Sequence, residues 1–436
     1  MAVSQYIYCT KPNRETRRTT NAKEGVMGAI QINEELLADS DFFNDEARRA
    51  QLVAMFKFDQ RRVILGEGAL DRLAGECERL GAGRVFLIHD PGIPALAERV
   101  RSALAGLEVV GSYSEIAPNP SVASVDNCAR ALAEAEFDVA VALGGGSTMD
   151  TAKSALCVAA CGGSVADYFG FDKFDKPPLA PLVGIPTTAG TGSEASRVTV
   201  VADDTGKQAL YADYLQPKAA LVDPLLHSDL PPVLTAITGL DALGHALECT
   251  ASQKSNEIGD AVARVALAAG CPAYARAVAG GDQEARYEMA RCALLSGLLL
   301  SPINTGAGHA LGYGIEKISF ERGKPVPHGT AVAMVLPGVM RHNAPAVADK
   351  YYFAAGAAGL DLGGKSREQG VELMAGWIDG LRREHTPYGA LADADLRAED
   401  IPRMVEIAMG VRRLLDPNPV EVSADDAAVI YGGVLV

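Results

Sequence analysis

Two side chains that could bind a metal ion stand four residues apart in TGLDALGHALE, residues 238–248. We predict that this stretch is helical, which would place Asp241 and His245 on one face, one turn apart. A carboxylate and an imidazole at this spacing can chelate a divalent cation. An isolated pair of this kind is more often a polar pair on a helix surface. A metal site therefore requires further ligands from elsewhere in the chain.

Two more histidines can supply those ligands. His309 lies in the helical pattern GHALGYG, and His328 lies in the short motif PHG. One carboxylate and three imidazoles form a set that suits a borderline ion such as Fe(II) or Zn(II). We therefore predict a metal site made by Asp241, His245, His309 and His328. The remaining histidines have no comparable setting and are interpreted as structural; they are His89, His227, His342 and His385.

A glycine-rich stretch has the features of a phosphate-binding turn. VALGGGSTMDTAKS, residues 141–154, combines a predicted strand, three glycines and the start of a helix. Glycines let the backbone approach a ligand closely, and the free N–H groups of a helix N-terminus attract an anion. Ser147 and Thr148 cap this helix and could also bond a phosphate oxygen. The alternative is an ordinary strand-to-helix turn, because the stretch is not the dinucleotide fingerprint GxGxxG.

Two other stretches strengthen the prediction of a nucleotide site. GIPTTAGTGSEAS, residues 184–196, follows a predicted strand and places several hydroxyl groups around two glycines; they belong to Thr187, Thr188, Thr191 and Ser193. Asp90 ends the strand FLIHD, where a carboxylate can accept hydrogen bonds from a ribose and would repel the 2′-phosphate of NADP. The alternatives are a solvated loop and an aspartate that caps the next turn.

The elements that must position these residues fall into three regions. Residues 1–56 are polar and form an N-terminal extension with one short helical pattern, NDEARRAQLVAMF. Residues 57–230 alternate strand and helix patterns, which predicts a doubly wound, mostly parallel, Rossmann-like sheet. Residues 231–436 show only helical patterns and are predicted to form an all-helical domain that binds the metal.

Composition excludes several classes of protein. Of the 436 residues, 40 are Lys or Arg and 55 are Asp or Glu, so the net charge is −15. An acidic surface disfavours nucleic-acid binding, which needs clustered basic side chains. No apolar run reaches the roughly 20 residues of a membrane span. The eight cysteines contain no CxxC and are predicted to be reduced thiols in the core of a cytoplasmic protein.

Taken together, the motifs resemble those of the iron-containing (group III) alcohol dehydrogenase family. Four of them match in order, from about residue 57 to the end of the chain: GGGSTMDTAK, PTTAGTGSE, GLDALGHALE, and HALGYG followed by PHG. The resemblance implies a cleft between an α/β domain and a helical domain. It implies NAD(P)-linked interconversion of an alcohol and an aldehyde or ketone, with the substrate oxygen held by Fe(II) or Zn(II). We also expect a homodimer or a higher homo-oligomer.

The resemblance also implies roles for single residues. The four metal ligands are the residues predicted above. The nucleotide site would be lined by Asp90, Asn119, Gly145, Gly146, Ser147, Thr187, Thr188 and Thr191. Lys207 is a further cofactor-binding candidate, although the alignment around it is loose.

The sequence departs from the family pattern between the last two ligands. Many members carry a histidine four residues after the third ligand, where this chain has Tyr313, which puts a histidine proton relay in doubt. Tyr313, a water or a ribose hydroxyl could take that role. The stretch EKISFERGK, residues 316–324, lengthens the spacing and is predicted to form a loop near the cleft mouth. Its basic side chains are either solvated or turned toward a small anionic aldehyde, such as one bearing a phosphonate; they are Lys317, Arg322 and Lys324.

Two other functions fit parts of the pattern. A lyase of the dehydroquinate synthase type shares the broad architecture, NAD and a metal, but recycles its cofactor. A nucleotide-binding protein without catalytic activity would need neither the ligand set nor a substrate. The helix with Asp241 and His245, together with HALGYG, favours the dehydrogenase over both.

Overall fold

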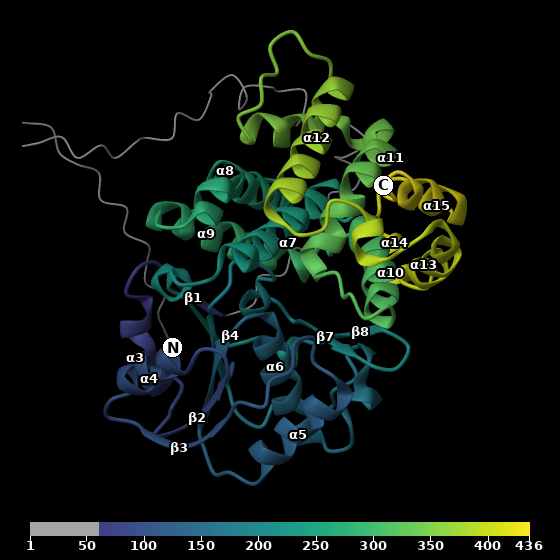
Figure 1. Cartoon of the computed structure of the whole chain (residues 1–436). Helices are drawn as coiled ribbons and strands as arrows, with labels where there is room; N and C mark the ends of the chain where they lie inside the picture. Colours follow the sequence, from purple (N-terminus) through teal and green to yellow (C-terminus); the bar gives the residue numbers. More distant parts are fainter. Residues whose placement is uncertain (1–60) are drawn as a thin grey trace, which may run out of the picture. The chain divides into compact units, whose positions relative to one another are not determined.

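The central element is a parallel sheet of six strands. The computed structural model describes residues 61–436, and Figure 1 shows the sheet below a layer of helices. The strands lie in the order β1 (Arg62–Leu65), β9 (Ala219–Val222), β6 (Leu182–Pro186), β4 (Val139–Gly144), β2 (Arg84–His89) and β3 (Glu108–Tyr113), and every neighbouring pair is parallel. The predicted parallel α/β fold is confirmed, although β3 was not among the predicted strands.

Helices cover both faces of this sheet, as its continuous apolar strands require. In β2, Val85 and Leu87 face one core, whereas Phe86 and Ile88 face the other. The first core is closed by α3 (Leu73–Arg79) and α4 (Pro94–Ala103), and the second by α5 (Val122–Ala133) and α6 (Gly146–Cys161). The sheet is therefore doubly wound, and its strands are shielded from water on both sides.

The winding direction changes between β2 and β4. Strand β2 pairs with β3 on one side and with β4 on the other. In open α/β sheets ligands bind at such a switch point, outside the carboxyl ends of the strands. The residues that follow these two ends are Asp90 after β2 and Gly145 after β4. The topology therefore brings two predicted cofactor-binding positions together.

A smaller sheet joins the first region, and the sequence analysis did not predict it. It contains β5 (Gly170–Phe171), β8 (Lys207–Tyr211) and β7 (Val198–Ala202), with β7 antiparallel to β8. Short 3-10 turns connect the elements; they are η2 (Ala69–Arg72), η3 (Val165–Tyr168), η4 (Ser193–Ala195), η5 (Asp213–Leu215), η6 (Pro224–His227), η7 (Leu391–Ala394) and η8 (Ala398–Asp400). Strand β8 matters for the site because Lys207 and Tyr211 lie at its two ends.

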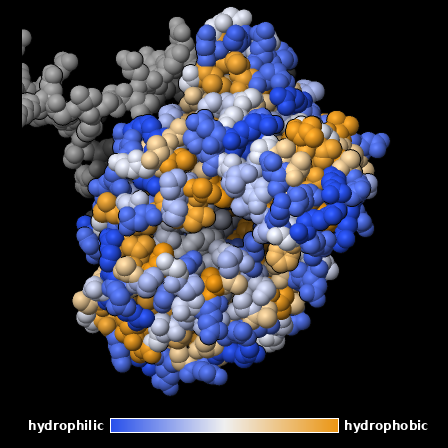
Figure 2. All heavy atoms as spheres, in the orientation of Figure 1, coloured by the Kyte–Doolittle hydropathy of each residue, from blue (hydrophilic) through white to orange (hydrophobic). Residues whose placement is uncertain are grey.

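The second half of the described chain is helical, as predicted. Its helices are α7 (Pro232–Ala251), α8 (Glu257–Ala279), α9 (Gln283–Leu300), α10 (Ala307–Glu321), α11 (His328–Ala357), α12 (Arg367–His385), α13 (Ile401–Met409), α14 (Arg412–Leu415) and α15 (Ala424–Gly432). None of the helices within residues 61–436 is long and apolar enough to cross a membrane. Hydrophilic and hydrophobic residues are interspersed over the face drawn in Figure 2.

The predicted domain boundaries stay predictions. The last strand of the large sheet ends at Val222 and α7 begins at Pro232, on either side of the expected boundary at residue 230. The extension of residues 1–56, with its helical pattern at residues 44–56, lies outside the described residues. Seven cysteines are free thiols, six of them buried, as predicted; Cys9 also lies outside the described part.

The predicted loop at residues 316–324 is largely wrong. Helix α10 continues through this stretch to Glu321, so only residues 322–327 connect it to α11. Ile318 and Ser319 are buried against neighbouring helices, which stabilises the helical extension. The additional residues therefore lengthen a helix instead of a loop.

Helices α7 and α11 approach each other closely where α11 begins. A Cβ atom on Gly329 would overlap the carbonyl oxygen of Ile237 and lie 3.1 Å from the Cβ of Asp241. Only glycine fits there without moving one of the helices. The glycine of the PHG motif therefore sets the distance between His328 and Asp241.

We expect Gly329→Ala to lower the midpoint of thermal unfolding by several degrees, because forced overpacking costs about 1–3 kcal/mol. Gly376→Ala on α12 is the matched control, since a Cβ there meets nothing within 4 Å. That control should be neutral or stabilising by about 0.5–1 kcal/mol. Equal midpoints for the two variants, measured at one scan rate, would contradict the packing argument.

Candidate active site

A cavity of about 830 Å³ collects residues from the α/β half and from the helical half. Its lining includes all the predicted metal ligands, the proposed relay residue and the cofactor-binding residues that the resemblance implies: Asp90, Asn119, Gly145, Gly146, Ser147, Thr187, Thr188, Thr191, Lys207, Asp241, His245, His309, Tyr313 and His328. These residues span more than 230 positions of the chain. The structure thus brings the two predicted sites together in one cavity, whereas their individual roles stay predictions.

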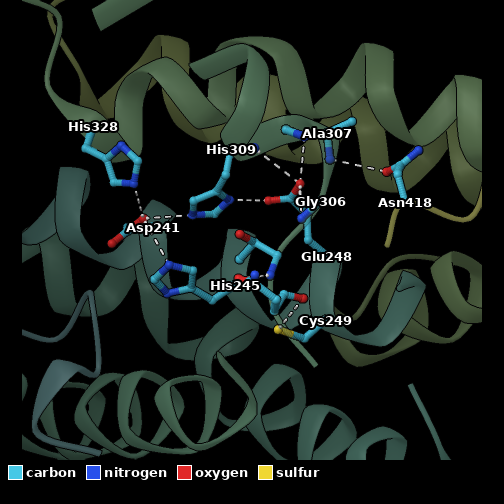
Figure 3. Close-up of polar contacts among 12 residues, drawn as sticks. Asp241, His245, Glu248, Cys249, Gly306, Ala307, His309, His328 and Asn418 are labelled. Carbon is cyan, nitrogen blue, oxygen red and sulfur yellow. Dashed lines mark hydrogen bonds and ion pairs between the residues drawn. The ribbon is translucent and has the colours of Figure 1, made fainter. Parts of the chain in front are cut away.

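Three imidazoles converge on one carboxylate oxygen. The Nε2 atoms of His245, His309 and His328 each lie 3.6 Å from Oδ1 of Asp241, as Figure 3 shows. This distance is too long for a hydrogen bond. Neither Asp241 Oδ1 nor His309 Nε2 has a hydrogen-bond partner in the structure, although both atoms are buried. Buried polar atoms without partners are costly, so this arrangement indicates a missing ligand.

A single metal ion would satisfy these atoms. Four donors placed tetrahedrally at about 2.1 Å from a Zn²⁺-like ion lie roughly 3.4 Å apart, close to the separations seen here. The donor atoms of Asp241, His309 and His328 lie within 4.8 Å of one another. His245 joins them through its contact with Asp241 and through stacking on His309, with ring centroids 4.7 Å apart. The residues therefore fit the predicted divalent ion.

Two buried glutamates orient the histidines from behind. Nδ1 of His309 bonds to Oε2 of Glu248, and Nδ1 of His328 lies 2.6 Å from Oε1 of Glu316. Because a carboxylate accepts the Nδ1 proton, Nε2 presents its lone pair toward Asp241. Glu248 also accepts the backbone N–H groups of Gly306 and Gly308 at 3.1 and 2.6 Å, at the start of α10 (Figure 3). The carboxylate of Glu248 thus binds both the His309 side chain and the N-terminus of α10, the helix that carries His309.

The electrostatics of the cluster lower the pKa values of two of its carboxylates, Asp241 and Glu316. Burial would raise the pKa of Glu316, but the charges of Lys207 and His328 lower it to about 2. Burial likewise opposes the charged form of Asp241, and the surrounding histidines hold its pKa below the usual range. Burial lowers the pKa of His245 to about 4, which favours the neutral imidazole that binds metals. Burial also disfavours protonated His309, but Glu248 and Asp241 raise its pKa to about 9.

The nucleotide side of the cavity begins at the glycine turn after β4. A Cβ on Gly146 would lie 2.8 Å from Oγ1 of Thr191, so the turn and the hydroxyl-rich loop are in contact. Asn119 adopts a left-handed backbone (φ 54°) and donates its N–H to Oγ of Ser147 at 3.3 Å. Thr148, which was expected to bond phosphate, is buried and does not line the cavity. Of the two hydroxyl residues predicted at the N-terminus of α6, only Ser147 therefore lines the cavity.

A buried lysine joins this turn to the hydroxyl-rich loop. Lys153 on α6 donates from Nζ to the carbonyl oxygens of Ser193 and Val198, at 3.0 and 2.6 Å. Ser193 in turn donates its hydroxyl to Asp150 at 2.6 Å. Burial lowers the pKa of Lys153 to about 8 and raises that of Asp150. Both residues belong to the quoted motif STMDTAK, but the sequence analysis assigned them no role.

The basic residues of the stretch 316–324 do not reach the cavity. Lys317 donates to the carbonyl oxygen of Asp204 at 2.9 Å, Arg322 pairs with Asp400, and Lys324 pairs with an aspartate at 2.8 Å. None of the three lines the cavity. Of the two alternatives left open for these side chains, orientation toward the substrate is therefore wrong, because each has a partner outside the cavity.

Other residues of the site were missed, although helical spacing could have revealed some. Glu248 follows Asp241 by seven residues, and Glu316 follows His309 by seven, so each shares a helix face with its ligand. Tyr313 lies between His309 and Glu316 on that same face, and its ring centroid is 5.7 Å from that of His328. By contrast, no local signal marks Arg413, which lines the cavity from α14.

Lys207 lines the cavity next to Glu316 and Tyr313. Its Nζ lies 2.6 Å from Oε2 of Glu316 and 5.3 Å from the centre of the Tyr313 ring. The lysine is therefore neutralised by the glutamate that orients His328. Its predicted contact with the cofactor stays a prediction.

Comparisons with known proteins agree with this geometry. Residues 60–224 match the family model "Iron-containing alcohol dehydrogenase", and residues 235–434 match "Fe-containing alcohol dehydrogenase family, C-terminal". The chain belongs to the iron-containing alcohol dehydrogenase family. Members of this family are enzymes, and the family supports NAD(P)-dependent alcohol dehydrogenase activity.

Three relatives illustrate the range of this dehydrogenase family. A choline dehydrogenase of Bacillus subtilis (strain 168) is 37% identical over 360 residues, which cover 79% of this chain and 86% of the relative. A solved 1,3-propanediol oxidoreductase is 29% identical with a TM-score of 0.82, covering 87% and 100% of the two chains. A sulfoacetaldehyde reductase from Bifidobacterium kashiwanohense, solved with NAD+, is 28% identical with a TM-score of 0.77, covering 87% and 98%.

We expect Glu248→Gln to weaken the binding of a divalent ion about 10- to 100-fold, the usual effect of losing such a supporting partner. The amide preserves the volume but keeps only one acceptor oxygen, so it cannot accept both from His309 Nδ1 and, on the other side, from the backbone N–H groups of Gly306 and Gly308. Titration of the metal-free protein with Co(II) or Zn(II) measures the affinity. Glu288→Gln on α9, outside the cavity, is the control and should bind metal normally. Unchanged affinity in the Glu248 variant would show that this carboxylate does not support the site.

Proposed function

We propose that this protein is a metal-dependent, NAD-linked dehydrogenase that interconverts an alcohol and an aldehyde or ketone. The observation that supports it most directly is the convergence of three imidazole Nε2 atoms on Oδ1 of Asp241, within the cavity that also holds the glycine turn after β4. Family membership supports the same reaction class. The metal is proposed to be Fe(II), with Zn(II) as the alternative.

Asp241, His245, His309 and His328 would hold the ion, which supplies a Lewis acid for charge on the substrate oxygen while the nicotinamide carries the hydride. The chain's own contribution is position and electrostatics. Glu248 and Glu316 keep the Nε2 atoms of two histidines aimed at one point. The Gly145–Ser147 turn offers backbone N–H groups and a hydroxyl to the cofactor phosphates.

The proton of the alcohol needs an acceptor close to the ligands. Tyr313 occupies the position at which many relatives carry a histidine, and its ring lies beside His328. Its hydroxyl accepts a hydrogen bond from Arg413 at 3.3 Å. We therefore propose Tyr313 as the group that passes on the proton, with a water or a ribose hydroxyl as the alternatives.

The substrate is a small molecule, and its charge is not set by family membership. By their names, the relatives act on a cation (choline), on a neutral diol and on an anionic sulfonate. An anionic aldehyde, phosphonate-bearing ones included, is the substrate class proposed for this chain. The basic residues of the stretch 316–324, which the sequence left as candidates to select it, do not line the cavity, so other side chains must select the substrate.

Two simpler functions remain as alternatives to test. A dehydroquinate synthase-type lyase would recycle its cofactor and cause no net change in NADH absorbance. A nucleotide-binding protein without catalytic activity would bind NAD but convert no substrate. Net NADH consumption with an aldehyde panel, in the presence of Fe(II) or Zn(II), distinguishes both from the dehydrogenase. The homo-oligomeric state and the cytoplasmic location stay proposals.

We expect His309→Ala to lose metal binding and turnover while keeping the fold, because it removes one donor and leaves Glu248 able to cap α10. Metal content and NADH consumption measure the loss, and circular dichroism measures the fold. His342→Ala on α11 is the control, because its Nε2 bonds only to the carbonyl oxygen of Glu421 at 2.9 Å, outside the cavity. Full metal occupancy with normal turnover in the His309 variant would refute the ligand assignment.

We expect Asp90→Asn to raise the ratio of kcat/KM for NADPH over NADH roughly tenfold or more, because it removes a negative charge near the expected ribose 2′ position. The amide oxygen can still accept the N–H of Gly92, which Asp90 Oδ1 holds at 2.7 Å. Asp229→Asn, at another carboxylate in the cavity lining, is the comparison. If both variants shift the ratio equally, the effect is not local to Asp90.

A further inference from the structure

We propose that Arg413 binds an acidic group of the substrate, a carboxylate, sulfonate or phosphonate, and so makes the enzyme selective for anionic aldehydes. The proposal rests on the dehydrogenase function proposed above, since it names the substrate class of the same cavity. The basic residues of the stretch 316–324 do not line the cavity, whereas Arg413 does.

Arg413 reaches the cavity from a firmly anchored position. It is the second residue of the short helix α14, and the next two residues, Leu414 and Leu415, are buried in the helical core. Its neighbour Arg412 behaves differently: it is exposed and pairs with Asp416 at 2.6 Å. The two adjacent arginines thus offer a direct comparison between a paired surface cation and a cation that faces the site.

The guanidinium of Arg413 has two phenol oxygens as its hydrogen-bond partners in the described part of the chain. It donates to the hydroxyl oxygens of Tyr211 and Tyr313, at 2.9 and 3.3 Å. Within residues 61–436 the structure gives it no carboxylate partner. The other cation near the ligands, Lys207, is neutralised by Glu316 at 2.6 Å. A partly buried arginine usually pairs with an anion, so its open positive charge points to an anion brought by a ligand.

The phenols hold this cation in place and leave donors free. The guanidinium carbon lies 5.9 Å from the ring centre of Tyr211 and 5.7 Å from that of Tyr313, within the range of cation–π contacts. The two hydrogen bonds use two of its five N–H donors. A planar guanidinium with free N–H groups matches the paired oxygens of a carboxylate, sulfonate or phosphonate.

Tyr211 is itself fixed by a strained residue. Asn304 donates from Nδ2 to the Tyr211 hydroxyl at 3.0 Å and lines the same cavity. Its backbone has φ 75°, which is uncommon for a residue other than glycine. Strained residues of this kind cluster at ligand sites, where the fold holds them in place. The cation is thus preorganised before any ligand binds.

The position of Arg413 also limits the length of the substrate. One aromatic ring separates the guanidinium from the ligands, because Tyr313 contacts Arg413 on one side and its ring centre lies 5.7 Å from that of His328 on the other. A molecule that places its carbonyl at the metal and its acidic group on Arg413 must therefore be short. This geometry fits a compact aldehyde with an acidic group at its far end.

The test compares aldehydes of matched size on the full-length, metal-loaded enzyme. The probes are 4-oxobutanoate, sulfoacetaldehyde and phosphonoacetaldehyde, with butanal as the neutral reference and betaine aldehyde as the cationic one. Wild type should favour at least one acidic aldehyde over butanal in kcat/KM and disfavour the cation. Arg413→Gln should lower the ratio of acidic to neutral kcat/KM about 30-fold or more, mostly through KM, the usual effect of removing one member of a buried charge pair.

Further variants separate charge recognition from a structural role. Arg413→Lys keeps the charge and should recover part of the ratio, whereas Arg412→Gln should leave it unchanged. Binding of sulfoacetate to the NAD-loaded protein, measured by calorimetry, should weaken in Arg413→Gln without a change in NAD affinity. An equal fall for neutral and acidic aldehydes in that variant would assign Arg413 a purely structural role.

Two outcomes with wild type alone decide the matter even if the variants do not fold. A preference for butanal over all three acidic aldehydes overturns the role of Arg413 but leaves the dehydrogenase intact. An absence of NADH consumption with every aldehyde overturns the proposed function itself.

Discussion

The site depends on one buried carboxylate oxygen that has no hydrogen-bond partner. Oδ1 of Asp241 lies at the same 3.6 Å from three imidazole nitrogens, too far to bond any of them. Burying such a group costs free energy unless something satisfies it. A divalent cation would satisfy all four atoms at once. The bound cation would therefore offset the cost of burying these atoms without hydrogen-bond partners. The helices α7, α10 and α11 must all be in place for that arrangement to exist.

The same spacing is used twice to build this cluster. Helix α7 presents Asp241 and Glu248 seven residues apart, and α10 presents His309 and Glu316 seven residues apart. Each helix therefore carries a ligand and a supporting carboxylate on one face. The supporting carboxylate of one helix acts on the histidine of the other, because Glu248 of α7 orients His309 of α10. The geometry of the proposed metal site consequently depends on how these two helices pack.

The cavity joins this cluster to the switch point of the sheet. The residues after β2 and β4 face the same space as the metal ligands, so a hydride carrier and a substrate can meet there. Lys153 stabilises the hydroxyl-rich loop through its bond to the carbonyl oxygen of Ser193. The small sheet of β5, β7 and β8 brings Tyr211 and Lys207 to the cavity. Both halves of the described chain thereby contribute side chains to the cavity.

Local pattern was sufficient for the fold class and for the candidate ligands. Strand–helix alternation predicted the parallel sheet, because the periods 2 and 3.6 are properties of neighbouring residues. The spacing of Asp241 and His245 predicted a shared helix face for the same reason. The four motifs were also specific enough to identify the family before any geometry was known.

Features that depend on contacts between distant segments were decided by the tertiary structure. Whether Glu248 would face His309, 61 residues away, depends on how α7 and α10 cross, which no local period encodes. The short strand β8 pairs with β7 on one side and with β5 on the other, so these strands form through pairing with each other and not through local propensity. Arg413 lies 100 residues from Tyr313, and the basic residues after Glu316 were turned outward by the continuation of α10. The sequence by itself thus determined the elements and the family, whereas the packing of distant helix ends decided which charged side chains, Arg413 among them, line the cavity.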